Sequence, residues 1–233
     1  MLFTYITLIL ASYFFGAVPF MILIGRLKGI DLSREPDLHH ALWYKVGRRW
    51  GTLGFLLDVA KGIVPVLVGY LLQFPTIVAV LSGIASLCGQ MWPVFRHFNG
   101  ERGNTTGVGA DITFSVAWGA PLICIIGISF AFIGFLVRTI NRWQQSGQSL
   151  NERLKFGGTP SLALPLGVIT GFISCVVISP LFAQPAEITL GYAGVAALII
   201  IRRLTAGITE DLRKSSRPCS VLINRLLFDR SEI

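Results

Sequence analysis

Long stretches of apolar sequence without a single charge constrain this chain more than any other feature. The longest, Gly62 to Phe95, runs for 34 residues, and Leu2 to Gly25 adds another 24. A helix needs about 20 mainly apolar residues to cross the hydrocarbon core of a bilayer. Only 14% of the residues are charged, against about 25% in ordinary soluble domains. The sequence therefore predicts an all-α, polytopic helical bundle in a membrane.

The same composition excludes several other classes of protein. A disordered chain needs a high charge, and a secreted disulfide-stabilised domain needs more than four cysteines in 233 residues. No spacing of cysteine or histidine completes a zinc site, so we expect no metal and no other cofactor. The net charge of +8 is interpreted as a signal of membrane topology, and we expect no nucleic-acid partner.

Proline and glycine divide the apolar stretches into spans. Leu2 to Gly25 is predicted as one permanent span, and Pro75 marks a turn between two further helices. The segment around 104–137 has two solutions: one helix over 112–137, or two helices separated by a break at Trp118-Gly119-Ala120-Pro121. The other predicted helices are approximately 51–72, 75–95, 156–186 and 188–201.

The distribution of positive charge decides between the two solutions, because Lys and Arg collect on the cytoplasmic side of a membrane. With two helices, all 20 Lys and Arg lie on one side, and the opposite side carries only Glu187. We therefore predict seven transmembrane helices, with the N-terminus outside and the C-terminus in the cytoplasm. Residues 1–207 form the seven-helix domain in this prediction, and 208–233 form a cytoplasmic tail that is a short helix or lies on the membrane surface.

A glycine-rich loop between two predicted spans is the first candidate for chemistry. Four glycines lie within ten residues between Gly100 and Gly109, and they let backbone N–H groups turn toward an anion. Arg102 is a bidentate phosphate donor, and Thr106 lies where the next helix is expected to begin. The loop predicts a phosphate site formed by Gly100, Arg102, Gly103 and Thr106; the alternative is a turn or a close helix crossing.

Two further groups of polar residues lie close to the predicted membrane boundary. His39 and His40 follow two carboxylates and are a candidate base, or else belong to a solvated interfacial loop. Asp58 and Lys61 are one helical turn apart just inside a span, where ionisable groups are costly. They are either functional or an ion pair that lets the helix insert.

Taken in order, these motifs form a family pattern. They are Gly16-Ala17-Val18-Pro19, Gly25-Arg26-Leu27-Lys28, Leu57-Asp58-Val59-Ala60-Lys61-Gly62, Gly89-Gln90-Met91-Trp92-Pro93, Thr106-Gly107-Val108-Gly109 and Arg202-Arg203-Leu204. From about residue 10 to 210 the chain resembles the bacterial membrane enzymes that transfer an acyl group from acyl phosphate to glycerol 3-phosphate. The resemblance implies seven membrane helices in the cell inner (plasma) membrane, a cytoplasmic active site, and phospholipid synthesis as the process.

The resemblance also implies roles for particular residues. Arg102 and the amides from Gly100 to Gly103 would hold the donor phosphate, and Asp58 and Lys61 would serve the site. The acceptor phosphate has three candidate cations, Lys45, Arg48 and Arg49. His39 or His40 would be the base. The expected partners are acyl phosphate, glycerol 3-phosphate, membrane lipid, and an enzyme at the membrane that produces acyl phosphate.

The chain departs from the family pattern at several positions. Ser33 to Leu42 replaces a longer G-S-G-N-type loop, Gln90 replaces a histidine, and Arg102 replaces a lysine; Ala197 and Ile200 stand where the family has His and Asn. The main interpretation is an acyltransferase that makes lysophosphatidic acid. The alternative is a diverged, catalytically weak or inactive paralogue that binds lipid or acyl phosphate. A small transporter is disfavoured, because the spans other than the one with Asp58 and Lys61 lack buried charge.

Overall fold

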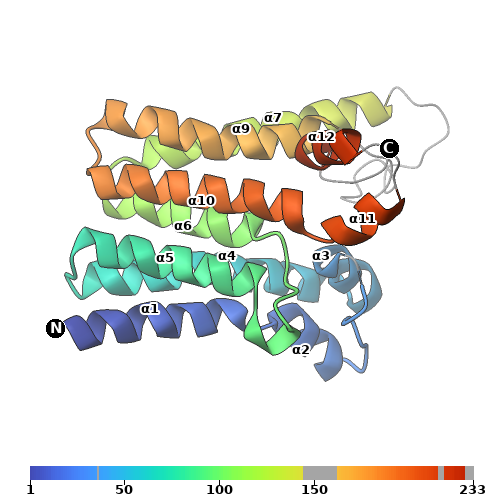
Figure 1. Cartoon of the computed structure of the whole chain (residues 1–233), viewed down its shortest axis with the longest axis horizontal. Coiled ribbons are helices and arrows are strands. Elements are labelled where there is room, and N and C mark those ends of the chain that lie inside the picture. Colours follow the sequence, from blue (N-terminus) through green and yellow to red (C-terminus); the bar gives the residue numbers. More distant parts are fainter. Residues whose placement is uncertain (36, 144–161, 215–217, 229–233) are drawn as a thin grey trace. The chain divides into compact units, whose positions relative to one another are not determined.

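The computed structural model describes residues 1–35, 37–143, 162–214 and 218–228. Over these residues the chain is helical, which confirms the all-α prediction (Figure 1). It forms two compact units, Met1–Trp118 and Gly119–Ile233. We describe the units one at a time, and the boundary predicted at residue 207 stays a prediction.

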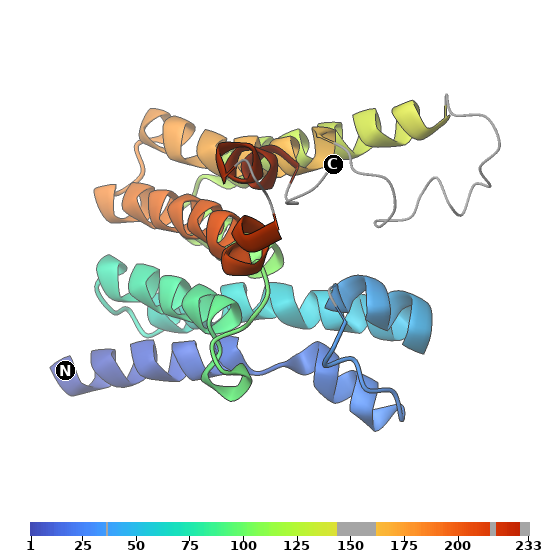
Figure 2. The ribbon, with the colours of Figure 1, turned by 45° about the vertical axis from the view of Figure 1, so that its right-hand side comes forward.

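The first predicted span is a bent pair of helices. Helix α1 (Leu2–Ala17) and helix α2 (Phe20–Leu27) meet at an angle of 45°, and Figure 2 shows the bend. Pro19 lies at the junction, where it has no N–H to continue the helical hydrogen bonds of α1. The span predicted from Leu2 to Gly25 is therefore broken by a bend at Val18-Pro19.

Three longer helices complete the first unit. Helix α4 (Arg48–Leu71) and helix α5 (Thr76–Met91) are joined by the turn predicted at Pro75, and helix α6 (Asn104–Ala117) follows the glycine-rich loop. A short 3₁₀ turn, η2 (Val94–Arg96), lies within that connection. Helix α1 packs along α5, and α4 packs against both α5 and α6 (Figure 1). The hairpin of two helices around Pro75 is confirmed.

Helices α4 and α6 cross at a pair of glycines. A Cβ atom on Gly62 would lie 2.0 Å from the carbonyl oxygen of Thr106, and one on Gly109 would lie 2.1 Å from that of Val59. Both distances are far below van der Waals contact, so only glycine permits this approach. Close backbone contact through small residues is the usual way in which membrane helices associate. The crossing brings the start of α6 against the middle of α4.

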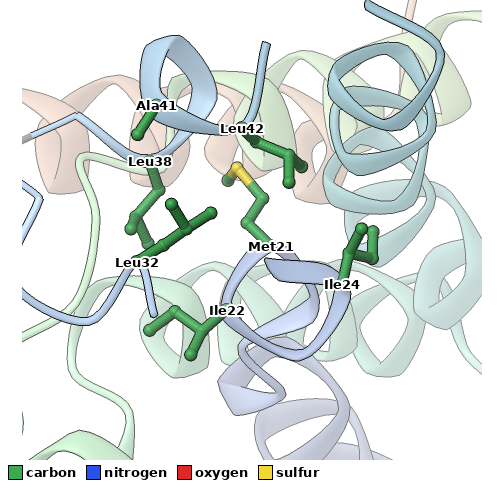
Figure 3. Packing of buried hydrophobic residues seen from close by; sticks show 7 residues of the cluster. All are labelled: Met21, Ile22, Ile24, Leu32, Leu38, Ala41 and Leu42. Atoms are coloured by element: carbon green, nitrogen blue, oxygen red, sulfur yellow. The ribbon is translucent and has the colours of Figure 1, made fainter. Parts of the chain in front are cut away.

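A hydrophobic cluster fixes the segment between α2 and α4. It includes helix α3 (Leu38–Ala41) and the single turn of π-helix η1 (Leu42–Val46). Leu32 and Leu42 are fully buried, and both lie against Met21 of α2 (Figure 3). The full cluster is Met21, Ile22, Ile24, Leu32, Leu38, Ala41 and Leu42. These contacts hold the polar residues around α3 in one place.

The described residues of the second unit include three long helices and a tail. Helix α7 (Pro121–Trp143) packs along α9 (Ala163–Ile178), which ends in the 3₁₀ turn η3 (Ser179–Phe182) and is followed by α10 (Ala186–Thr205). The gap between α6 and α7 at residues 118–120 confirms the break that was one of the two predicted solutions. Residues 156–161 of the predicted span 156–186 lie outside the described residues.

The tail contains two short helices, α11 (Ile208–Lys214) and α12 (Pro218–Phe228), where a single short helix or a surface-lying segment was predicted. Arg225 of α12 is buried, and its guanidinium donates to the carbonyl oxygens of Arg203 and Ala206 at the end of α10. It also ion-pairs with Asp211 of α11. One arginine therefore joins three helices of this unit.

Length and composition identify the elements that can cross a membrane. Among the described residues, five helices are long and apolar enough, and six are if the bent pair α1–α2 counts as one span. Helix α6 has only 14 residues, so it is about 21 Å long at 1.5 Å per residue, less than the roughly 30 Å of a bilayer core. The chain is a multi-pass helical membrane protein.

Candidate active site

A buried ion pair forms the centre of the candidate site. The Lys61 ammonium lies 3.0 Å from Asp58 Oδ1, one helical turn apart on α4, and both side chains are 1% exposed. The prediction that these two residues lie one helical turn apart within a span is confirmed. Because an uncompensated charge inside a protein is costly, each group compensates the charge of the other.

The side chain of Gln90 bridges the two charged groups. Its Oε1 accepts a hydrogen bond from Lys61, and its Nε2 donates to Asp58 Oδ2 over 3.2 Å. Gln90 is itself buried near the C-terminal end of α5. The three side chains therefore form a closed network, in which the amide oxygen of Gln90 accepts and its amide nitrogen donates.

Two hydroxyl groups attach α4 to its neighbours at the same level. Thr106 Oγ1 donates to the carbonyl oxygen of Asp58 over 2.9 Å, and Ser86 Oγ donates to that of Lys61 over 2.8 Å. The second bond has a specific cause. Pro65 lies four residues after Lys61 inside α4 and has no N–H to offer that carbonyl. Ser86 supplies the missing donor from α5.

His39 is brought to this network by the local structure of α3. The side chain of Asp37 accepts a hydrogen bond from the backbone N–H of His40 and caps the short helix. His39 Nε2 then lies 3.4 Å from Asp58 Oδ2, with the histidine side chain 33% exposed. The imidazole thus contacts a buried carboxylate on one side and is open to solvent on the other.

Glu101 completes the group from the glycine-rich loop. Its Oε2 lies 3.7 Å from His39 Nε2, and its side chain is 21% exposed. Burial, followed by the negative charge of Asp58, raises the pKa of Glu101 to about 8. A carboxyl group with such a pKa is largely protonated at neutral pH, which reduces its repulsion of a phosphate ligand.

The glycine loop is folded back onto the end of α5. The N–H of Gly100 donates to the carbonyl oxygen of Met91, and that of Glu101 donates to Gln90. A Cβ on Gly100 would lie 2.2 Å from the Gln90 carbonyl oxygen, and Gly103 has a φ of +76° at the start of α6. Two of the loop amides are therefore occupied by carbonyls of the chain itself. The N–H groups of the first turn of α6, from Asn104 to Thr106, have no partner within the helix.

The other predicted residues lie outside the buried network. Lys45 is exposed and pairs with Glu35 at 2.6 Å. The His40 ring lies against that of Tyr44, with the ring centroids 4.4 Å apart. Arg48, Arg49 and Arg102 are exposed. Binding of substrate by these cations stays a prediction, and the geometry favours His39 over His40 as the base.

Sequence spacing did not reveal two acidic residues. Glu101 follows His39 by 62 positions, yet the loop brings both to Asp58, so a carboxylate–histidine group exists that no local motif predicted. Asp111 lies in the middle of α6 and is 5% exposed. The argument that buried ionisable groups are confined to the span with Asp58 and Lys61 is therefore wrong, because α6 also carries a buried carboxyl group.

Apolar helices around a buried polar network with a solvent-facing histidine define a membrane-embedded enzyme-like site. A family model described as glycerol-3-phosphate acyltransferase matches residues 6–210 of the chain. The chain belongs to this family. A glycerol-3-phosphate acyltransferase 4 of Dehalococcoides mccartyi (strain CBDB1) is 26% identical over 97% of the chain and 89% of the relative. A glycerol-3-phosphate acyltransferase of Thermoanaerobacter sp. (strain X514) is 32% identical over 68% of each protein.

A solved structure has the same fold. The crystal structure of PlsY (YgiH), an integral membrane glycerol 3-phosphate acyltransferase in its glycerol 3-phosphate form, covers 91% of the chain with a TM-score of 0.63 and 26% identity. The alignment covers 93% of that protein. The predicted resemblance to this family is confirmed.

Proposed function

We propose that the protein transfers an acyl group from acyl phosphate to a hydroxyl of glycerol 3-phosphate, which yields lysophosphatidic acid and inorganic phosphate. Membership of the family supports the activity. The observation that carries the assignment to this site is the contact between His39 and the buried Asp58, next to the loop that begins α6. Membrane lipid surrounds the site, and an enzyme that produces acyl phosphate at the membrane is the proposed supplier.

The proposed mechanism uses His39 as the general base. As the hydroxyl oxygen of glycerol 3-phosphate attacks the acyl carbon, its proton passes to His39 Nε2. Asp58, 3.4 Å away, stabilises the imidazolium that forms. Lys61 and Gln90 hold Asp58 in place and ionised. The bond between the acyl carbon and the phosphate oxygen then breaks, and no covalent acyl-enzyme is required.

The leaving phosphate carries negative charge that the protein has to stabilise. Arg102 and the N–H groups at the start of α6 are the proposed donors, because a helix N-terminus and a guanidinium both favour phosphate. Lys45, Arg48 and Arg49 supply positive charge for the acceptor phosphate. Holding the two substrates and stabilising this charge can supply most of the rate acceleration.

The assay uses the protein purified in detergent with palmitoyl phosphate and radiolabelled glycerol 3-phosphate. We expect lysophosphatidic acid from the parent. His39→Ala should lower kcat by about 10²–10⁴-fold, the range for loss of a general base, and His40→Ala should cost much less. Equal losses in the two variants would remove His39 as the base, and no product from the parent would refute the activity.

Glu101 favours one alternative function. Its carboxyl group lies 3.7 Å from His39, where an ionised form repels both substrate phosphates. A diverged paralogue that binds lipid or acyl phosphate without turnover fits this feature. In that case the parent binds a non-hydrolysable acyl phosphonate in calorimetry but forms no product, and Glu101→Gly does not restore turnover.

We also propose the finer topology, with seven spans including α1–α2 as one and α6 as another, the N-terminus outside and the C-terminus in the cytoplasm. The support is the placement of all 20 Lys and Arg on one side. A cysteine at Gln184 should react with a membrane-impermeant reagent on intact cells, and one at Gln148 should not. The reverse pattern would refute this topology.

A further inference from the structure

Three potential metal ligands converge from three separate elements of the first unit. His39 comes from α3, Asp58 from α4, and Glu101 from the loop before α6. Their ligand atoms all lie within 4.8 Å of one another. Among the described residues, no other group of three His, Cys, Asp or Glu side chains meets this condition.

We propose that His39, Asp58 and Glu101 bind a divalent transition-metal ion of the Zn²⁺ class, and that the bound ion inhibits acyl transfer. The metal would occupy His39 Nε2, so that this nitrogen can no longer accept the substrate proton. The inhibition rests on the proposed function, in which His39 is the base. The binding itself does not depend on any activity.

The distances between the side chains fit a four-coordinate ion. Bonds of about 2.0–2.1 Å in a tetrahedron place the ligand atoms about 3.3–3.4 Å apart. The distance from His39 Nε2 to Asp58 Oδ2 is 3.4 Å, and that to Glu101 Oε2 is 3.7 Å. All three ligand atoms lie within 4.8 Å of one another, so the partly exposed Glu101 side chain has to move inward, toward Asp58 as well as His39, to complete the tetrahedron. Three protein ligands leave the fourth position to water.

The surroundings of Asp58 orient its carboxylate toward that position. Lys61 pairs with Oδ1, while Gln90 donates to Oδ2 and uses one of its two lone pairs. The same Oδ2 atom lies 3.4 Å from His39 Nε2. Hydrogen-bonded partners of this kind fix the ligands of metal sites in proteins. Asp58 is 0% exposed, so its direction is determined before any ion arrives.

The ligand set also selects the kind of metal. The carboxyl groups of Asp58 and Glu101 converge here, and the buried ammonium of Lys61 pairs with Oδ1 of Asp58, the oxygen that does not face His39. A second positive charge between the carboxylates is therefore favourable. Imidazole together with carboxylate suits zinc and its neighbours, whereas Mg²⁺ prefers six oxygen ligands. The ion enters from solvent past His39, which is 33% exposed.

The test measures binding and inhibition separately on the full chain in detergent. The protein is treated with chelator and titrated with Co²⁺, whose visible absorption reports four-coordinate binding, and then with Zn²⁺ in competition. We expect one ion per chain in the parent. His39→Ala and Glu101→Gln should each weaken binding by at least about tenfold, the loss that even outer partners of metal ligands cause.

His40→Ala is the matched control, because His40 is the adjacent residue on α3 and packs against Tyr44 instead. It should bind Co²⁺ like the parent, and all variants must show the parent's helical circular dichroism. The proposed site would be refuted if the parent did not bind one ion per chain. It would also be refuted if His39→Ala and Glu101→Gln both bound Co²⁺ as tightly as the parent. Stoichiometric binding without loss of turnover on adding Zn²⁺ would overturn the inhibition. A parent that binds metal but has no turnover in chelator would refute the proposed function and leave the site standing.

Discussion

Removing the charge of Lys61 tests the buried ion pair at the centre of the site. In Lys61→Met the side chain keeps its bulk, but Asp58, which is 0% exposed, loses its cation. Two unit charges 3.0 Å apart attract by about 5 kcal/mol at an effective dielectric constant of about 20. Removing one partner of a buried pair typically costs about 3–5 kcal/mol. We expect the free energy of unfolding in detergent to fall by that amount.

The double variant Asp58→Asn with Lys61→Met separates folding from function. It buries no charge, and Gln90 can still bond to the new amide, so its stability should return to within about 1–2 kcal/mol of the parent, as isosteric replacements of buried pairs usually do. Turnover of glycerol 3-phosphate should be absent. A double variant with the parent's kcat would refute the role of this pair in the site.

A surface pair provides the control for these measurements. Lys45 pairs with Glu35 at 2.6 Å, but the lysine side chain is 53% exposed. Exposed ion pairs contribute about 0–1 kcal/mol, so Lys45→Met should unfold close to the parent. If Lys45→Met and Lys61→Met destabilise the protein equally, burial does not determine the effect, and the reasoning fails.

Three further predictions concern other contacts. Gly109→Ala should lower the free energy of unfolding by about 1–3 kcal/mol through overpacking, since its Cβ would lie 2.1 Å from the Val59 carbonyl oxygen. Thermal unfolding measures this loss, and Val116→Ala, at a side chain that is 57% exposed, is the control. Arg102→Ala should weaken binding of an acyl phosphonate in calorimetry by about 2–5 kcal/mol, and Arg102→Lys by less. Unchanged binding would mean that the loop is a helix-packing turn and does not bind phosphate. Arg225→Met should speed hydrogen exchange throughout α12, because the bonds to the end of α10 are lost, whereas equal exchange would mean that other contacts hold the helix.

Local patterns predicted the helices well. The turn at Pro75 and the break at 118–120 follow from the geometry of proline and glycine, and both are present. The bend at Pro19 was missed, because the apolar run continues on both sides of this proline without a polar residue to mark a turn. A proline at that position is compatible both with a kinked span and with two helices.

The site was only partly predictable from the sequence. Asp58 and Lys61 are one turn apart on a helix, so their contact followed directly from helical geometry. Glu101 and Gln90 reach the same place through a loop whose path depends on tertiary contacts, and no spacing in the sequence carries that information. Asp111 lies in a segment for which the sequence allows two helix assignments, and only one of them places this carboxyl group inside an apolar helix, where an ionisable group indicates a functional role.

The bond between Ser86 and the carbonyl oxygen of Lys61 has a consequence for how this protein can evolve. Pro65 removes the helical donor of that carbonyl, and the Ser86 hydroxyl replaces it from another helix. Loss of the hydroxyl alone leaves a buried acceptor without a partner, at a cost of about 1–3 kcal/mol, whereas exchange of the proline for a residue with an N–H makes the hydroxyl dispensable. The two positions should therefore covary among relatives: lineages that keep the proline retain a small donor on α5, and that donor drifts only where the proline has already been lost.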